Sequence, residues 1–232
     1  MKIVRIQDSK HVKYSNEHWK LLRSLRAYAL RIMKILLNSG LDPIVHGSIA
    51  RGDVHKNSDI DIVIPYYTNP FLIENALDMA GISLLKKEIV QATPRHAIKA
   101  SIYIDERTVV TFPLSKLSRL EREFYRFSGE INSDDLEKNL RVPGVNKKLL
   151  AIIPVEDGHI EFSIIGREHE VAEILKVSID IVKEREYILT RRDEKGRTGV
   201  FVHKELPPDM SIAEAALKIA RQNLMFRKQL II

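Results

Sequence analysis

The run from Asp59 to Ile64 constrains the fold of this chain more than any other segment. Its aspartates alternate with isoleucines, and Pro65 closes it. Alternate side chains of a β-strand leave opposite faces, so the isoleucines would point into a core while Asp59 and Asp61 share the other face. The sequence therefore predicts a strand that is anchored on one side and carries two carboxylates on the other.

Two carboxylates side by side repel each other unless a cation or a proton lies between them. Oxygen ligands suit Mg²⁺, which usually completes its coordination with water and substrate phosphates. An Asp-x-Asp pair on its own more often marks a solvated strand edge, so the surrounding sequence has to decide between the two interpretations.

A glycine–serine turn precedes the pair. Residues Pro43 to His46 form another predicted strand, which leads into Gly47 and Ser48. Gly47 has no side chain that would block a close approach. Ser48 supplies a hydroxyl and opens a predicted helical turn, whose free N–H groups favour an anion such as a phosphate. A phosphate-holding turn beside a carboxylate pair predicts a nucleoside triphosphate site.

This combination resembles the signature of the DNA polymerase β-like nucleotidyltransferase superfamily. The likeness lies in a Gly-Ser-x-Ala-Arg-Gly run followed by Ser-Asp-Ile-Asp-Ile. The residues that carry it are Gly47, Ser48, Arg51, Gly52, Ser58, Asp59 and Asp61. It is closest to the minimal nucleotidyltransferases of prokaryotes and is also similar to archaeal CCA-adding enzymes. The whole chain resembles a group of archaeal predicted nucleotidyltransferases, and the strand–helix order extends the likeness to about residue 113.

The resemblance implies an α+β fold, with a polymerase β-like mixed sheet flanked by helices. It implies that Asp59 and Asp61 are catalytic and bind two magnesium ions, and that Gly47 and Ser48 hold the phosphates of an NTP. An acceptor hydroxyl would attack the α-phosphorus in line, and pyrophosphate would leave. Arg51 could compensate the triphosphate charge, or it could be a solvated or salt-bridged arginine.

One departure concerns a third carboxylate, which catalytic members of the superfamily carry on a later strand. The matching run, Thr108 to Pro113, contains none. Asp105 or Glu106 at an expected turn, or Glu161 in a later strand, could substitute, although each is also typical of a turn or surface residue. Without a third carboxylate the site could bind a nucleotide and transfer it slowly or not at all.

Periodicity and turn residues predict the remaining elements of the first part of the chain. Its helices are expected at 16–37, 70–79 and 115–140, and its further strands at 83–91, 98–104, 108–112, 149–154 and 159–165. In the first helix, leucines and other apolar residues form one stripe, while basic residues such as Arg26 fall mostly elsewhere. We expect a nucleotidyltransferase domain at 1–165 and a smaller helical, winged-helix-like domain at 166–232.

The second part resembles a helix-turn-helix, with helices expected at 168–175 and 179–186. Residues 189–202 predict two strands around a charged turn, as in a wing. The residues there that could contact nucleic-acid phosphates are Arg191, Arg192, Lys195 and Arg197. Acidic residues dilute the would-be reading helix, so the pair could instead be a packing module. A last amphipathic helix at 211–228 could dock on its own domain or pair with a second subunit as a homodimer.

Composition excludes several classes of protein. The chain has no cysteine, so it holds no disulfide, thiolate zinc site or cysteine nucleophile, and a cytoplasmic location is expected. No apolar run approaches the roughly 20 residues that span a bilayer, so no membrane association is expected. The net charge of +6 is compatible with a nucleotide or nucleic-acid partner.

These observations lead to two hypotheses. The first is a Mg²⁺-dependent nucleotidyltransferase that moves an NMP group from an NTP to a hydroxyl on an RNA, a protein or a small molecule. The alternative is a nucleic-acid-binding regulator in which a catalytically weak nucleotidyltransferase fold senses a nucleotide. A weaker option, by analogy with minimal nucleotidyltransferases alone, is an antitoxin-like role with a partner protein.

Overall fold

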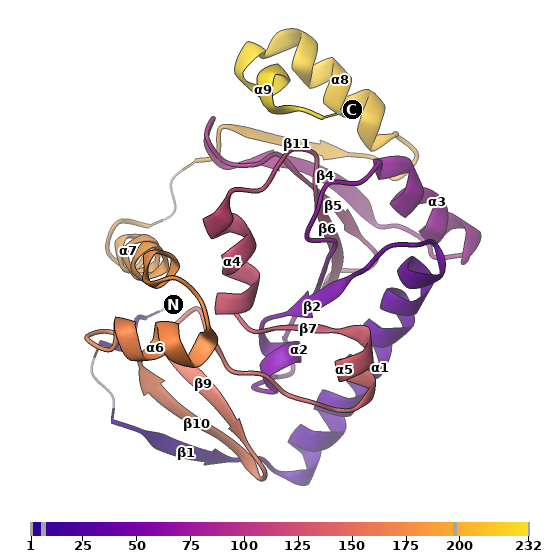
Figure 1. Ribbon diagram of the computed structural model, residues 1–232. Coiled ribbons are helices and arrows are strands. Elements are labelled where there is room, and N and C mark those ends of the chain that lie inside the picture. The colour runs from indigo at the N-terminus through magenta and orange to yellow at the C-terminus, as the bar shows by residue number, and fades with distance from the viewer. Residues whose placement is uncertain (1, 6–7, 197–198, 232) are drawn as a thin grey trace. The chain divides into compact units, whose positions relative to one another are not determined.

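A computed structural model describes residues 2–5, 8–196 and 199–231 (Figure 1). The chain divides into two compact units. Unit 1 contains residues 1–30, 45–58 and 119–198, and unit 2 contains residues 31–44, 59–118 and 199–232. Helix α1 (Asn16–Asn38) and strand β2 (Ile44–His46) contribute residues to both units.

Unit 1 has an antiparallel four-stranded sheet with strand order β1-β10-β9-β8. Its elements are β1 (Lys10–Lys13), α2 (Ser48–Arg51), α4 (Arg119–Phe127), β7 (Glu130–Asn132), α5 (Ser133–Glu137), β8 (Gly144–Val145), β9 (Leu150–Val155), β10 (Gly158–Ser163), α6 (Glu168–Leu175) and α7 (Ile179–Lys195). The two strands expected at 149–154 and 159–165 are present as β9 and β10, which pair directly around the turn at Glu156 and Asp157. Apolar residues from this sheet, α6 and α7 share one core with Phe127 at the end of α4.

The predicted wing is wrong where the structure describes it. Helix α7 continues through Arg191, Arg192 and Lys195 and ends at Gly196, so these basic residues lie on its last turns. The run of Arg, Asp, Glu and Lys before the glycine consists mostly of good helix formers, which explains why the helix does not stop earlier. Arg197 lies outside the described residues. The next strand, β11 (Val202–Leu206), pairs with β4.

The start of α7 is bonded to α4. The carboxylate of Asp180 accepts a 2.6 Å hydrogen bond from Arg119, and the Ser178 hydroxyl donates to Glu123. The guanidinium of Arg185 lies 4.7 Å from the ring centre of Phe124. Helix α7 therefore packs on α4 of its own unit through its first turns. A short turn at residues 176–178 separates it from α6.

Unit 2 has a mixed sheet with strand order β11-β4-β5-β6-β3, in which β3 and β6 are parallel and the other pairs antiparallel. Its elements are β3 (Ile60–Val63), α3 (Pro70–Met79), β4 (Lys86–Gln91), β5 (Lys99–Tyr103), β6 (Thr108–Pro113), β11, α8 (Ile212–Gln222) and α9 (Leu224–Gln229). The predicted mixed sheet flanked by helices is confirmed.

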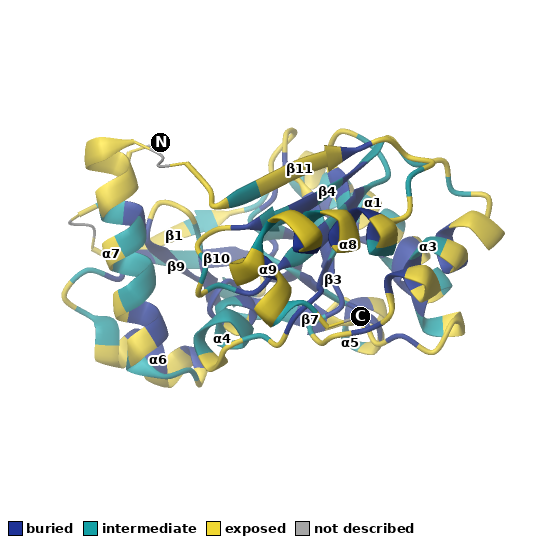
Figure 2. Cartoon of the chain, turned by 90° about the horizontal axis from the view of Figure 1, so that it is seen from above, coloured by how far each residue is buried: buried dark blue, intermediate teal, exposed yellow. Residues whose placement is uncertain are grey.

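Helices cover one face of this sheet. On that face of β4, buried Lys87 bonds to Glu74 of α3, and Gln91 bonds to Gln229 of α9. The predicted terminal helix is broken at Asn223 into α8 and α9, which pack on unit 2 through a small apolar set and expose their outer sides (Figure 2). The opposite face of the sheet carries Asp61 and is only half-buried.

Within the described ranges, no helix is long and apolar enough to cross a membrane.

Candidate functional site

The glycine–serine turn adopts a conformation that favours glycine. Gly47 follows β2 with φ 79° and ψ −144°, and α2 begins at Ser48. A Cβ added to Gly47 would meet no atom within 4 Å, so glycine is required there by the backbone angle, and the space beside it is open. At Gly52, which ends α2, an added Cβ would lie 2.7 Å from the Cδ of Arg141, so the missing side chain makes room for that arginine.

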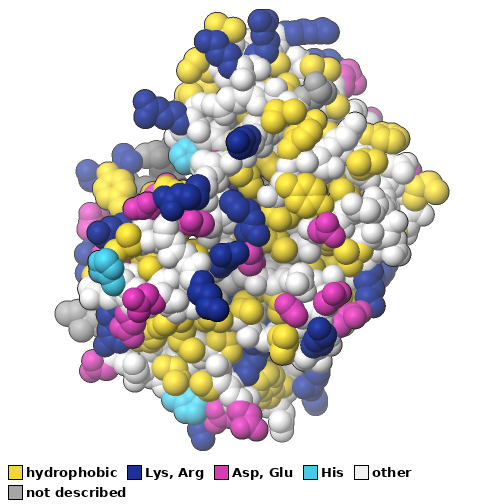
Figure 3. Space-filling view, in the orientation of Figure 1, with side chains coloured by type: hydrophobic (Ala, Val, Ile, Leu, Met, Phe, Trp, Pro, Cys, Tyr) yellow, Lys and Arg dark blue, Asp and Glu magenta, His cyan; other side chains and the backbone are white. Residues whose placement is uncertain are grey.

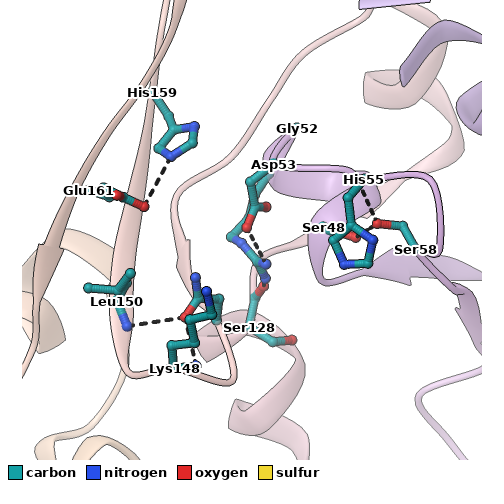
Figure 4. Close-up of polar contacts among 12 residues, drawn as sticks. Ser48, Gly52, Asp53, His55, Ser58, Ser128, Lys148, Leu150, His159 and Glu161 are labelled. Atoms are coloured by element: carbon teal, nitrogen blue, oxygen red, sulfur yellow. Dashed lines mark hydrogen bonds and ion pairs between the residues drawn. The ribbon is translucent and has the colours of Figure 1, made fainter. Parts of the chain in front are cut away.

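Hydrogen bonds join the turn to the loop that leads into the carboxylate strand. The Ser48 hydroxyl donates to the Ser58 hydroxyl at 3.4 Å, and Ser58 accepts from the His55 N–H at 2.9 Å (Figure 4). The Gly47 N–H donates to the Gly129 carbonyl at 2.9 Å. Ser58 is buried and is followed directly by Asp59. Hydrogen bonds therefore connect the glycine–serine turn to Ser58, the residue before the first aspartate.

Arg26 of α1 holds the far end of the turn. Its guanidinium donates to the carbonyl oxygens of Ile49 and Ala50 at 2.9 Å each, and to that of Leu140 at 2.7 Å. Burial, with a smaller contribution from Arg141, lowers the pKa of Arg26 to about 10, so the group remains charged at neutral pH. Sequence analysis missed this role, because the predicted apolar stripe left out Leu22 and Met33, which are buried on the same side of the helix as Arg26.

Arg51 is also turned inward. Its Nη2 lies 2.9 Å from the carboxylate of Asp53, and its Nη1 donates to the Ser128 carbonyl at 2.5 Å. The side chain is only 5% exposed. Of the two interpretations left open for this residue, the structure places it in an ion pair inside unit 1.

An aromatic and histidine cluster lies next to the turn in unit 1. The Tyr14 hydroxyl is 2.7 Å from Nδ1 of His159, and the Tyr14 ring stacks on His18 with ring centres 3.6 Å apart. His18 in turn bonds to the carbonyl of Gly52 at 2.8 Å. Burial raises the pKa of Tyr14, and the negative charge of Asp53 adds to this effect. The cluster thus contacts the turn through Gly52 and keeps the phenol protonated.

The two aspartates occupy β3 as the alternation predicts. Asp59 is exposed just before the strand and Asp61 is half-buried within it, while Ile60 and Ile62 are buried on the other face. In the parallel pairing of β3 with β6, Asp61 is level with Val109.

The candidate substitutes for a third carboxylate lie in the turn before β6 and on β10. Asp105 accepts hydrogen bonds from the N–H groups of Arg107 and Thr108 at 2.8 and 2.9 Å, so it shapes the turn before β6. Glu161 belongs to β10 of unit 1, where it lies 3.5 Å from His159 (Figure 4). Glu106 is exposed in the same turn as Asp105. In the part of the chain that the structure describes, no three His, Asp or Glu side chains are grouped so that they could hold a metal ion.

A second group of charged residues shares the half-buried face with Asp61. The Tyr103 hydroxyl donates to Glu88 at 3.2 Å, and the Lys86 ammonium lies 2.6 Å from the same carboxylate. Burial and then the charge of Glu88 raise the pKa of Tyr103, and Asp61 contributes in the same direction. No motif marks these residues, and only the alternation of β4 and β5 could have placed them on one face.

A family model described as a nucleotidyltransferase domain matches residues 29–198, which is more than half of the chain. The chain belongs to the nucleotidyltransferase domain family. No curated protein and no solved structure matches it. The family match confirms the resemblance and the fold class expected from the motif. It includes both halves of the motif and also α6 and α7. Transfer of a nucleotidyl group from an NTP is thus the general chemistry of this domain.

Proposed function

We propose that this nucleotidyltransferase-domain protein is a Mg²⁺-dependent enzyme that moves an NMP group from an NTP to a hydroxyl acceptor. The observation that carries the proposal is the 3.4 Å hydrogen bond between Ser48 and Ser58. Because Ser58 is bonded directly to Asp59, this contact ties the predicted phosphate turn to the start of the carboxylate strand. Family membership supports the same conclusion.

The donor set fits a magnesium ion that arrives with a nucleotide. Asp59 and Asp61 leave the same face of β3, and neither is fully buried. Mg²⁺ is usually bound through one or two carboxylates together with substrate phosphates, so two aspartates are enough. When bound, the ion would neutralise phosphate charge. The chain's own contribution at Gly47 is an open, preset backbone, which Arg26 and Gly129 hold in place.

In the proposed reaction, an acceptor hydroxyl oxygen forms a bond to the α-phosphorus while the bond from that phosphorus to pyrophosphate breaks. The hydroxyl proton passes to solvent water in the same step or just before it. RNA, protein and small-molecule acceptors all remain predictions, as does the cytoplasmic location that the lack of cysteine suggests.

The test uses Asp59→Asn and Asp61→Asn, which keep the shape of each side chain and remove its charge. Label transfer from α-labelled NTPs to a panel of RNA, protein and small hydroxyl acceptors should fall at least a hundredfold in both variants. Asp209→Asn, which changes an exposed aspartate of the same unit, should transfer as the wild type does. Wild-type protein that binds no NTP in the presence of Mg²⁺ would remove the proposal.

The nucleic-acid-binding alternative gains no support from the basic residues of α4. Basic side chains gather over α4 (Figure 3), but the arginines of this helix are paired with carboxylates. Arg122 lies 2.5 Å from Glu130, and Arg119 lies 2.6 Å from Asp180. The exposed end of α7, with Arg191 and Arg192, is the surface on which nucleic-acid contact stays a prediction.

A further inference from the structure

The residue level with Asp61 on the neighbouring strand is a valine. Asp61 pairs with Val109 in the parallel β3–β6 ladder, so both side chains leave the same face of the sheet. Both are half-buried. A side chain at position 109 is therefore placed to share a ligand with Asp61, and valine has no atom that can bind a cation.

Among the described strands of this sheet, no other side chain on the same face offers a replacement. Thr111, two residues along β6, bonds through its hydroxyl to Ser101 at 3.0 Å. The next carboxylate is Glu88 on β4, three strands from Asp61. At about 4.8 Å per strand the two backbones lie roughly 14 Å apart, whereas Mg²⁺ requires oxygens at about 2.0–2.1 Å. Glu88 is moreover bonded to Lys86 and Tyr103.

Two cations in one phosphoryl-transfer site demand more ligands than this face supplies. Such ions sit about 3.5–4 Å apart, one on the leaving side and one at the attacking oxygen. Each prefers near-octahedral oxygen coordination. The ion on the nucleotide side can use substrate phosphates, but the ion on the acceptor side depends on protein carboxylates. Two aspartates shared between two divalent ions would leave much of their mutual repulsion uncompensated.

We infer that Asp59 and Asp61 hold a single divalent cation, which enters with the nucleotide, and that Val109 occupies the position from which a side chain would complete a second, acceptor-side cation site. This inference rests on the proposed function and differs from the two ions that the family resemblance implies. It follows that nucleotide binding is intact while the acceptor hydroxyl must lose its proton without a cation beside it. Transfer by this protein is therefore slow.

The first experiment uses the wild-type chain. Mn²⁺ is titrated into the protein with a saturating NTP analogue whose α,β-bridge is a methylene, and bound Mn²⁺ is counted by electron paramagnetic resonance. One Mn²⁺ per protein–nucleotide complex is the expected result. Two would overturn the inference and leave the proposed function standing. Failure of the analogue and of authentic NTPs to bind would overturn both.

The second experiment adds the missing group. Val109→Asp should raise the count to two Mn²⁺ and increase NMP transfer at least tenfold. Val109→Asn introduces a side chain with the shape of aspartate but without its charge, and should change neither the Mn²⁺ count nor the rate of transfer. Equal melting temperatures of the three proteins show whether the half-buried position tolerates the changes. A folded Val109→Asp protein with one Mn²⁺ and the wild-type rate would overturn the inference; if that variant does not fold, the wild-type count decides.

Discussion

The guanidinium of Arg26 donates its Nε–H to the carbonyl oxygen of Ile49 at 2.9 Å, and so joins α1 to the turn that follows β2. Two further carbonyls, of Ala50 and Leu140, depend on the same side chain. A buried carbonyl that loses its partner costs about 1–3 kcal/mol, so a single arginine supports both the stability and the shape of this turn.

Arg26→Met should therefore lower the free energy of unfolding by on the order of 3 kcal/mol. It should also weaken NTP binding, because Ile49 and Ala50 belong to the short helix that opens at Ser48. Urea unfolding and calorimetric titration with Mg²⁺–NTP measure the two effects. Arg23→Met, which changes an exposed arginine one turn earlier, is the matched control and should do neither. Equal stability of the two variants would contradict the role assigned to Arg26.

The sequence predicted the carboxylate face of β3 because a strand has a period of two residues, and buried Ile60 and Ile62 leave no other register. It could not predict Arg26, since helical periodicity sorts residues by polarity and assigns an arginine to the solvent side, although Arg26 is buried in line with Leu22 and Met33. The hydrogen bond from Arg26 to Leu140 spans a long stretch of chain, which no local pattern contains.

The prediction of a wing was wrong for a different reason. A glycine within a charged segment is compatible with both a hairpin turn and a helix end, and the pattern before Gly196 does not distinguish them. The lack of a carboxylate at Val109, by contrast, was visible in the sequence. The structure added which residue it faces, because only the parallel register of β3 and β6 places Val109 level with Asp61.

His159 predicts a dependence of stability on pH. Burial lowers the pKa of its imidazole from the ordinary 6.5, although Asp53 and Glu161 oppose this shift and His18 adds to it. A lowered pKa means that the unfolded chain binds the proton more readily. This contribution to stability is therefore complete above pH 6.5 and is lost as the pH falls from 6.5 through the pKa of the folded state. Protonation also affects the 2.7 Å contact between Nδ1 and the Tyr14 hydroxyl, because both ring nitrogens of a protonated imidazole can only donate.

The midpoint of urea unfolding should accordingly decrease between pH 7.5 and pH 5.5, and the decrease should be smaller in His159→Gln. Replacing His203, whose side chain is half-exposed, with Gln provides the comparison. An identical slope in the wild type and in His159→Gln would show that this histidine does not contribute.

Breaking the ion pair between Lys87 and Glu74 should destabilise the fold. The two groups lie 2.5 Å apart, and the Lys87 side chain is 5% exposed. Lys87 also donates to the Met210 carbonyl at 3.0 Å, which links β4 to the segment before α8. Removing one member of a buried pair leaves the other charge uncompensated, at a cost of about 3–5 kcal/mol. Lys87→Met should show a loss of roughly 3 kcal/mol in urea unfolding.

The double variant Lys87→Met with Glu74→Leu removes both charges and should recover most of that loss, since an apolar pair of similar volume is often as stable as a buried ion pair. A double variant that is no more stable than Lys87→Met would mean that the ion pair itself stabilises unit 2, beyond avoiding an unpaired charge.

Gly47→Ala tests whether the backbone angle at Gly47 shapes the turn, because an added methyl group would meet no neighbouring atom. An alanine at φ 79° and ψ −144° is strained by about 1–3 kcal/mol, although its methyl group would meet no neighbour. Relief of the strain would rotate the peptide that precedes Ser48 and so disturb the proposed phosphate contact. We therefore expect Mg²⁺–NTP affinity to fall about tenfold or more. The free energy of unfolding should fall by about 1–3 kcal/mol, the size of the strain. Gly199→Ala, at an uncrowded glycine without a positive φ, should leave calorimetric affinity and urea stability unchanged. Wild-type affinity in Gly47→Ala would show that the angle at this residue does not shape the nucleotide site.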